Sequence, residues 1–273
     1  MQLDAKQTSA YFFRGRTYYY YGKYAESIAD ITKSLEYFSS DDDAHYFRGL
    51  SYYGLRKFPE SITEFTNCVD VNPKADNCYR YRGYNYVATR EYLKAIADYD
   101  KSFELDPKDT DIYRSRAWAY LYLNNGDKAY EQAATFLELN GLKDTTAPYV
   151  IIPGYLGLRK AKKDFGAKAF LQTWLPQVKP EAWTTSILKY FHGDMTAAQL
   201  LELATDNSKL TEAHAYIGMM QLFAGTPVPA KVHFNWVKEN GVKSFIEYDL
   251  AIAELNREAT SVKPTKVIRR RKN

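Results

Sequence analysis

Four arginines recur at a fixed interval in this 273-residue chain, and each stands directly before a small residue. The four pairs, spaced 34 residues apart, are Arg14-Gly15, Arg48-Gly49, Arg82-Gly83 and Arg116-Ala117. Acids recur with the same period at Asp30, Glu64 and Asp98, and Gln132 takes the next place. A guanidinium can hold a carboxylate through two parallel hydrogen bonds, so this pattern indicates ion pairing or anion binding rather than catalysis.

The sequence leaves two pairings of these residues open. In the first, each arginine meets the acid of the repeat before its own. Those pairs would be Arg48 with Asp30, Arg82 with Glu64, and Arg116 with Asp98. In the second, each arginine meets the acid that follows it in its own repeat, as Arg14 would meet Asp30. Because an unpaired buried charge is costly, we expect structural ion pairs in either geometry.

Around each arginine, aromatic and small residues recur at the spacing of two packed helices. The third repeat has this pattern most fully, with Tyr79, Gly83, Tyr92 and Ala95, and Pro107 near its end. Residues 8–141 resemble four tetratricopeptide repeats, a family of 34-residue helix-turn-helix units. The resemblance implies an all-α, right-handed superhelix of helical hairpins, in which small residues stand where the two helices approach closely.

The first helices of successive repeats line a concave groove in this family, so the resemblance also implies a partner-binding surface. The residues in the groove-facing slots are mostly aromatic or basic. They are Phe12, Arg16, Tyr19, Tyr20, Tyr46, Leu50, Tyr53, Arg80, Tyr84, Arg114, Trp118 and Tyr122. Because Tyr, Trp and Arg are enriched at binding hot spots, we expect a protein segment there, with acidic groups meeting Arg80 and Arg114. The alternative is that a chain with 25 tyrosines fills these slots by composition, some of them beneath a helix of its own.

The C-terminal half keeps weaker traces of the same unit. The twelve-residue step between small residues recurs from Gly157 to Ala169 and from Gly218 to Ala230. We therefore expect degenerate helical hairpins at about 148–176 and 211–240, within a helical module over residues 142–258. Residues 259–273 are expected to form a basic, disordered tail.

A narrower resemblance covers about residues 180–257. The segment "GVKSFIEYDLAIAEL" at 241–255, with the helices before it, is similar to the end of NlpI-type tetratricopeptide lipoproteins of bacteria. This implies a periplasmic, membrane-anchored adaptor that brings an envelope protease or cell-wall hydrolases together with partners. No lipid-attachment cysteine stands at the start of the sequence, so the expected location is either periplasmic, with the anchor outside this sequence, or cytoplasmic.

The two cysteines, Cys68 and Cys78, are too few for a metal site of about four ligands. One interpretation is a pair of buried thiols. The other is a disulfide across a helix-to-helix turn, since the two cysteines are close in sequence and the repeat frame puts them on facing helices. A disulfide would indicate an oxidising compartment.

Charge and hydropathy exclude some classes of protein. The net charge is +4, but six positive charges lie between Lys263 and Lys272, so the chain before them carries −2. A nucleic-acid binder needs a basic stripe on its folded surface, so we expect no nucleic acid on the folded body. No apolar run approaches the roughly 20 residues of a transmembrane helix.

Catalytic motifs are absent from the sequence: there is no Gly-rich phosphate loop, HExxH or nucleophile elbow. Of the scattered histidines, His45 and His214 occupy packing slots and are expected to lie in the core. The acids Asp41 to Asp43 begin the second repeat, where they favour a helix N-terminus. The sequence thus predicts a non-enzymatic adaptor without metal or cofactor that holds protein or peptide partners. A self-associating structural repeat protein, as a homo-oligomer, is the alternative.

Overall fold

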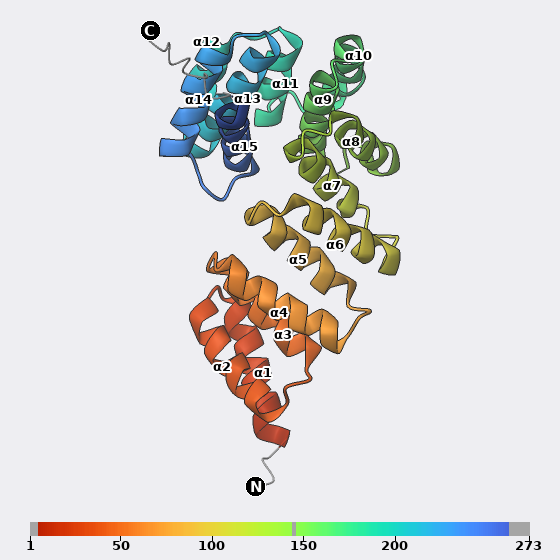
Figure 1. Ribbon diagram of the computed structural model, residues 1–273, viewed down its shortest axis with the longest axis vertical. Helices are drawn as coiled ribbons and strands as arrows, with labels where there is room; N and C mark the ends of the chain where they lie inside the picture. The colour runs from red at the N-terminus through yellow and green to blue at the C-terminus, as the bar shows by residue number, and fades with distance from the viewer. Residues whose placement is uncertain (1–4, 144–145, 262–273) are drawn as a thin grey trace, which may run out of the picture. The chain divides into compact units, whose positions relative to one another are not determined.

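The computed structural model describes residues 5–143 and 146–261, and within this part the secondary structure is helical without a strand. The chain divides into two compact units, Met1–Lys143 and Asp144–Asn273. The boundary lies close to residue 141, the predicted end of the regular repeats. Successive helices pair into hairpins in each unit (Figure 1). The prediction of an all-α fold of tetratricopeptide-type hairpins is confirmed.

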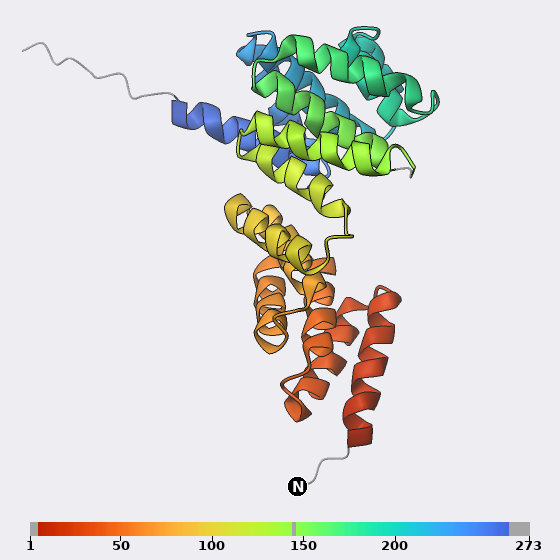
Figure 2. The ribbon, with the colours of Figure 1, turned by 90° about the vertical axis from the view of Figure 1, so that its right-hand side faces the viewer.

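The N-terminal unit consists of four hairpins (Figure 2). Its helices are α1 (Ala5–Tyr20), α2 (Tyr24–Tyr37), α3 (Asp42–Gly54), α4 (Phe58–Val71), α5 (Asp76–Ala88), α6 (Tyr92–Leu105), α7 (Asp111–Tyr122) and α8 (Gly126–Asn140). Odd-numbered helices open each repeat, and α3 packs against α1 as well as α5.

Glycine in the first helix of a hairpin lets the second helix come close. A Cβ on Gly83 would lie 2.5 Å from Cε1 of Tyr99, a side chain that is only 1% exposed. At Gly49 the same atom would meet the Phe65 ring at 3.0 Å. The ring of the second helix therefore takes the volume that any larger residue would need.

The turns inside the hairpins repeat as regularly as the helices. Gly22, Arg56, Arg90 and Asn124 recur with the period of the arginine series, and all have positive φ. The next residue of each turn donates its backbone N–H to a carbonyl of the preceding helix, as Glu91 does to that of Tyr86 at 2.7 Å. A residue in the left-handed conformation at this point allows the chain to reverse direction within a short turn.

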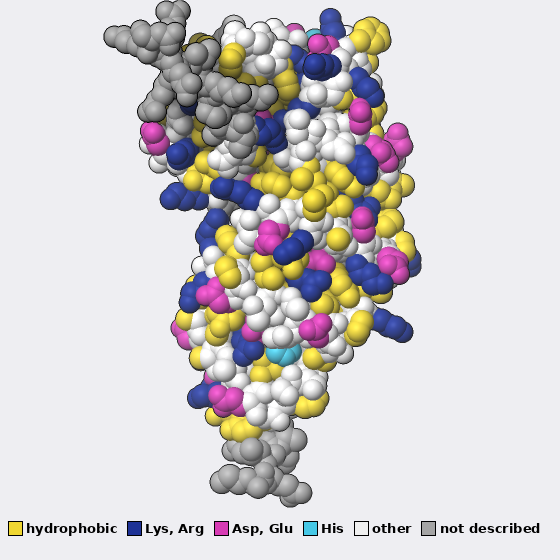
Figure 3. All heavy atoms as spheres, viewed as in Figure 1, with side chains coloured by type: hydrophobic (Ala, Val, Ile, Leu, Met, Phe, Trp, Pro, Cys, Tyr) yellow, Lys and Arg dark blue, Asp and Glu magenta, His cyan; other side chains and the backbone are white. Residues whose placement is uncertain are grey.

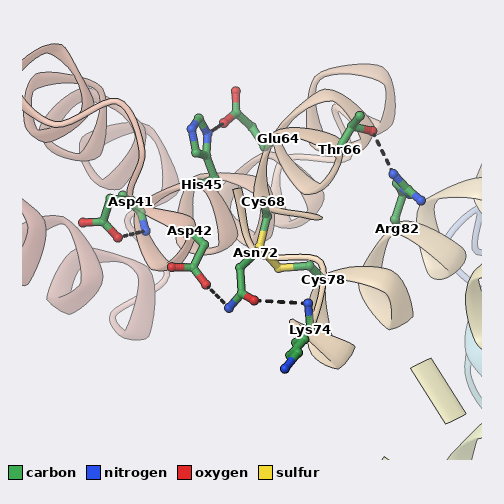
Figure 4. The surroundings of a disulfide bond; sticks show 11 residues. Asp41, Asp42, His45, Glu64, Thr66, Cys68, Asn72, Lys74, Cys78 and Arg82 are labelled. Atoms are coloured by element: carbon green, nitrogen blue, oxygen red, sulfur yellow. Dashed lines mark hydrogen bonds and ion pairs between the residues drawn. A yellow bond between two sulfur atoms is a disulfide. The ribbon is translucent and has the colours of Figure 1, made fainter. Parts of the chain in front are cut away.

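A disulfide joins the second repeat to the third (Figure 4). It links Cys68 on α4 with Cys78 on α5, and both residues are 1% exposed. Of the two interpretations left open by the sequence, the structure has the disulfide. Nearby, Asp41 caps α3 as expected, because its carboxylate accepts the Ala44 N–H at 3.0 Å, and Asp42 accepts a bond from Asn72 at 2.6 Å.

The C-terminal unit has seven α-helices and two short 3₁₀ helices in its described part. They are η1 (Ala147–Val150), α9 (Ile151–Lys160), α10 (Asp164–Trp174), η2 (Leu175–Gln177), α11 (Trp183–His192), α12 (Ala197–Leu203), α13 (Asn207–Phe223), α14 (Pro227–Asn240) and α15 (Ile246–Ser261). A Cβ on Gly218 would lie 2.5 Å from Cε1 of Phe234. The sequence interval and the geometry of this contact match those of Gly83 and Tyr99, so α13 and α14 form a hairpin of the same kind.

In the hairpin of α9 and α10, Gly157 and Ala169 do not occupy the two small-residue positions that the sequence predicted for them. Its left-handed turn residue is Lys162, and Lys163 donates its N–H to the Leu158 carbonyl at 2.9 Å. Measured from that turn, Tyr155 and the fully buried Ala167 occupy the two small-residue slots. The predicted register was wrong by two residues, because turn geometry fixes the frame and the spacing of small residues alone does not.

The closing helix α15 reaches Ser261, so residues 259–261, predicted to belong to a disordered tail, are helical. The remainder of the predicted tail lies outside the described residues. A buried ion pair ties α15 to α9: Lys160 Nζ lies 2.6 Å from Glu254 Oε1, and the two side chains are 6% and 7% exposed.

Candidate partner-binding site

The recurring arginines pair within their own repeats in the first three hairpins. Arg14 donates to Asp30 at 2.8 Å, Arg48 lies 2.9 Å from Glu64, and Arg82 forks onto Asp98 at 2.7 and 2.8 Å. The inter-repeat pairs Arg48 with Asp30 and Arg82 with Glu64 are therefore wrong. The reason is that the helices of one hairpin approach closely at the adjacent glycine, which brings the acid of the same repeat within reach.

In the fourth repeat, the arginine pairs with an acid of the preceding repeat instead. Arg116 has Gln132 in place of an acid, and its Nη2 lies 2.5 Å from Oδ1 of Asp100 in the preceding repeat, rather than from the predicted Asp98. Arg82 also touches the preceding repeat, where its Nη1 donates to Thr66 Oγ1 at 3.3 Å (Figure 4). These arginines therefore fix the packing of helices within and between neighbouring repeats.

Aromatic rings of the first helices form a connected row, which we call the aromatic row. It consists of Phe12, Tyr19 and Tyr20 on α1, Tyr46 and Phe47 on α3, and Tyr81 and Tyr84 on α5. Phe47 contacts α1 through Phe12 and Tyr20, with ring centroids 6.0 Å apart in both pairs. Tyr46 contacts Tyr81 at 5.7 Å, and Tyr81 contacts Tyr84 at 5.5 Å.

The row includes two residues that the groove-facing slots did not contain. Phe47 and Tyr81 stand directly before Arg48 and Arg82, as Phe13 stands before Arg14. This second series of rings, with the period of the arginines, was visible in the sequence. In the fourth repeat Ser115 takes its place, and the series ends there.

Exposure varies along the row. Tyr20 is 70% exposed, whereas Phe47 is 9% exposed and the other members are half-buried. Burial raises the pKa of Tyr46 and Tyr84 above the ordinary tyrosine value, so both phenols keep their protons and remain donors at neutral pH.

Arg16 and a hollow mark the first-repeat end of the row. The Arg16 guanidinium carbon lies over the rings of Phe12, Phe13 and Phe47 at 5.8, 5.2 and 5.9 Å. Next to Phe12 is a hollow of about 390 Å³. Its lining residues are Thr8, Ser9, Phe12, Phe13, Ser34, Tyr37, Phe38 and Asp41. A cation on aromatic faces beside an apolar hollow can bind both a charged group and an apolar side chain.

Three of the predicted groove residues are core residues in this structure. Leu50, Trp118 and Tyr122 are only 4%, 7% and 3% exposed. Tyr53 is 38% exposed and packs on Phe58 rather than in the row. The slots of a repeat frame specify a helix face, but packing decides how much of that face solvent reaches.

Arg80 and Arg114 already have acidic partners within the protein. Arg80 Nη1 donates to Asp109 at 2.5 Å, and Arg114 lies 3.3 Å from Asp111. A ligand carboxylate would have to compete with these acids, and the expectation that acidic groups of a ligand meet Arg80 and Arg114 stays a prediction.

The histidines and acids form no metal cluster in the part of the chain that the structure describes, where no three metal-binding side chains come together. His45 is buried against Glu64 at 2.8 Å (Figure 4), and His214 lies 2.8 Å from His233. Among the described helices, none has the length and apolarity to span a membrane. On the face drawn in Figure 3, acidic and basic side chains are interspersed.

Comparison with known proteins agrees with this geometry. Sequence models described as tetratricopeptide repeat match residues 14–68 and 82–109. A tetratricopeptide repeat protein from Parabacteroides merdae superposes with a TM-score of 0.67 at 15% identity, covering 92% of this chain and 100% of that one. MamA superposes with a TM-score of 0.60 at 15% identity, covering 71% of this chain and 98% of MamA.

Proposed function

We propose that this chain, a member of the tetratricopeptide repeat family, is a non-enzymatic adaptor that binds a segment of a partner protein along the aromatic row. The single observation that carries this proposal is the row itself, which connects the first helices of three repeats through ring contacts. Rigid rings bury large areas at little cost in side-chain entropy, which suits them to protein contacts.

The first-repeat end is the proposed anchor point. Tyr20 is exposed, Arg16 stacks on three rings, and the hollow beside Phe12 has room for a large apolar side chain. Binding energy in protein interfaces concentrates in such aromatic and arginine positions. Arg80 contributes less, because its charge is already met by Asp109.

We place the adaptor in an oxidising compartment such as the bacterial periplasm. The disulfide between Cys68 and Cys78 supports this location, since disulfides persist outside reducing cytosol. The resemblance to NlpI-type lipoproteins inferred from the sequence of residues 180–257 implies an envelope protease or a cell-wall hydrolase as the partner.

The test is affinity capture from an extract of the source organism, with bound proteins identified by mass spectrometry. The variant of the aromatic row, here called the row variant, carries Arg16→Glu and Tyr20→Ser. The matched control carries Tyr21→Ser. Tyr21 is the residue after Tyr20 and is 77% exposed, but it does not belong to the aromatic row. We expect a partner that is captured by the wild-type protein and by the control but not by the row variant.

Capture that is equal for all three proteins would reject the row as the binding site. A structural protein that self-associates is the rival function, and it predicts a mass in analytical ultracentrifugation that grows with concentration without any foreign partner.

A further inference from the structure

The first helix of each later repeat stacks on the repeat before it through a stripe of four positions. In repeats two, three and four, these positions hold Ala44, Phe47, Arg48 and Ser51; Cys78, Tyr81, Arg82 and Asn85; and Ile112, Ser115, Arg116 and Ala119. On α1, which has no repeat before it in the described part of the chain, the same positions hold Ala10, Phe13, Arg14 and Thr17. We call these four residues the α1 stripe.

The α1 stripe is exposed, although its counterparts are not. All four of its residues are exposed, whereas the same positions of α3, α5 and α7 are buried or half-buried. Phe13 is 53% exposed and Phe47 only 9%. The Arg14 side chain is 57% exposed, compared with 15% for Arg48. Helix α1 therefore presents to solvent the face with which the other first helices stack.

The arginine of the stripe bonds to the preceding repeat in every later hairpin. The three pairs, each 16 residues apart, are Arg48 with Thr32, Arg82 with Thr66, and Arg116 with Asp100, at 3.1, 3.3 and 2.5 Å. Arg14 uses Nε and Nη2 on Asp30 of its own repeat. Its Nη1 has no hydrogen-bond partner among the described residues, so this donor is available to another chain.

The helices that receive these arginines share a pattern. It is an apolar residue, then Thr or Asp, then an apolar residue three positions later, as in "ITKSL" at 31–35, "FTNCV" at 65–69 and "YDKSF" at 99–103. Ile31 and Leu35 lie in one buried cluster with Ala44 and Phe47. The apolar residues of the pattern therefore cover the apolar part of a stripe, while the residue between them meets its arginine.

The disulfide fixes the register of this contact. Cys68 is the fourth residue of "FTNCV", and Cys78 holds the first stripe position of α5. A helix that lay on the α1 stripe in the same way would place the fourth residue of its pattern opposite Ala10.

We propose that the α1 stripe binds an amphipathic helix of a partner protein with the pattern apolar, acid, two variable residues, apolar. The helix lies where the second helix of a preceding repeat would lie. Its acid meets Nη1 of Arg14, because a carboxylate adds charge to the hydrogen bond that the threonines make. None of the four stripe residues belongs to the aromatic row, so this is a second docking surface.

The experiment is a fluorescence anisotropy titration of the full chain into a labelled peptide with the sequence of residues 91–106, which contains "YDKSF". We expect saturable binding, and Asp100→Ala in the peptide should weaken it about threefold, as expected for one exposed ion pair. Absence of binding to the wild-type chain, or equal binding of both peptides, would overturn the proposal.

Thr17→Lys in the chain should weaken binding by more than about tenfold, because the longer side chain stands where the helix must pack. Thr63→Lys is the matched control, since Thr63 is also exposed and, like Thr17, donates to a carbonyl of its own helix. Tyr20→Ser should leave the affinity unchanged. Loss of binding with Tyr20→Ser but not with Thr17→Lys would place the peptide on the aromatic row and refute the stripe as its site.

Cysteine trapping tests the register. Ala10→Cys in the chain should form a disulfide with a peptide that carries Ser102→Cys, in a mixture of reduced and oxidised glutathione, whereas Thr63→Cys should not. Equal trapping by both would contradict the proposed contact. Sedimentation of the chain alone tests a second copy as the occupant: self-association that Thr17→Lys abolished would overturn the partner helix.

Discussion

Arg82 and Asp98 face each other across one hairpin, and two bonds of 2.7 and 2.8 Å join the guanidinium to both carboxylate oxygens. Their side chains are only 15% and 8% exposed. The hydrogen bonds and the charge of Asp98 raise the pKa of Arg82 above its ordinary value, so the arginine stays charged at any ordinary pH.

Arg82→Ala should destabilise the N-terminal unit strongly, because it leaves the Asp98 carboxylate buried without its partner. Loss of one member of a buried pair typically costs about 3 to 5 kcal/mol in unfolding free energy. Urea unfolding followed by circular dichroism measures it. Lys101→Ala is the matched control, since its pair with Glu104 is largely exposed and should be worth less than about 1 kcal/mol. Equal unfolding midpoints for the two variants would refute a structural role of the arginine series.

Gly83→Ala should lower stability by about 1 to 3 kcal/mol through overpacking against Tyr99. The new methyl group would stand 2.5 Å from a ring that has no room to move. Gly166→Ala is the contrasting variant, because its Cβ would meet nothing closer than 3.7 Å and alanine favours helix by about 1 kcal/mol. Thermal melts should therefore shift in opposite directions, and a stabilised Gly83→Ala protein would contradict the close approach of α5 and α6.

Reduction of the Cys68–Cys78 disulfide should lower the unfolding free energy by roughly 3 kcal/mol, the expected entropic effect of opening a short loop. Denaturation with and without dithiothreitol measures the change. The double variant Cys68→Ala, Cys78→Ala is the control, and reductant should not affect its midpoint, because the chain has no other cysteine. If reductant also left the unfolding midpoint of the wild-type protein unchanged, the disulfide would contribute nothing to its stability.

The C-terminal unit should lose stability as the pH rises from neutral to mildly alkaline. Glu212 and Glu247 are 7% and 3% exposed; Trp183 donates to the former at 3.1 Å and Tyr216 to the latter. Burial, then the charge of Glu247, raises the pKa of Glu212 from 4.5 to about 8. Burial likewise raises the pKa of Glu247. The folded unit thus keeps protons that the unfolded chain has released, so its advantage shrinks with rising pH until the folded pKa is passed.

Tryptophan fluorescence melts between about pH 6.5 and pH 8.5 measure this effect. Glu212→Gln and Glu247→Gln should flatten the dependence, whereas Glu239→Gln, at an exposed acid, should keep it. A wild-type melting temperature that rose with pH would have the opposite sign from that expected.

The sequence alone determined the hairpins and their period. Gly49 and Phe65, or Gly83 and Tyr99, meet inside one hairpin of two helices, so the contact depends only on helix geometry and a short turn. Such local contacts leave a fixed spacing in the sequence, and this is why the fold and most of the aromatic row could be predicted. Phe47 and Tyr81 also recur with the period of the arginines, so they too could have been predicted from the sequence.

The tertiary structure decided what depends on how helices rotate and pack. Packing buried Trp118 and Tyr122 in slots that the repeat frame places in the groove. Lys160 on α9 meets Glu254 on the distant α15, and Glu212 shares the core with Glu247 from another helix. No spacing in a sequence encodes such contacts, because many arrangements of helices satisfy the same local pattern and only the burial of side chains selects among them.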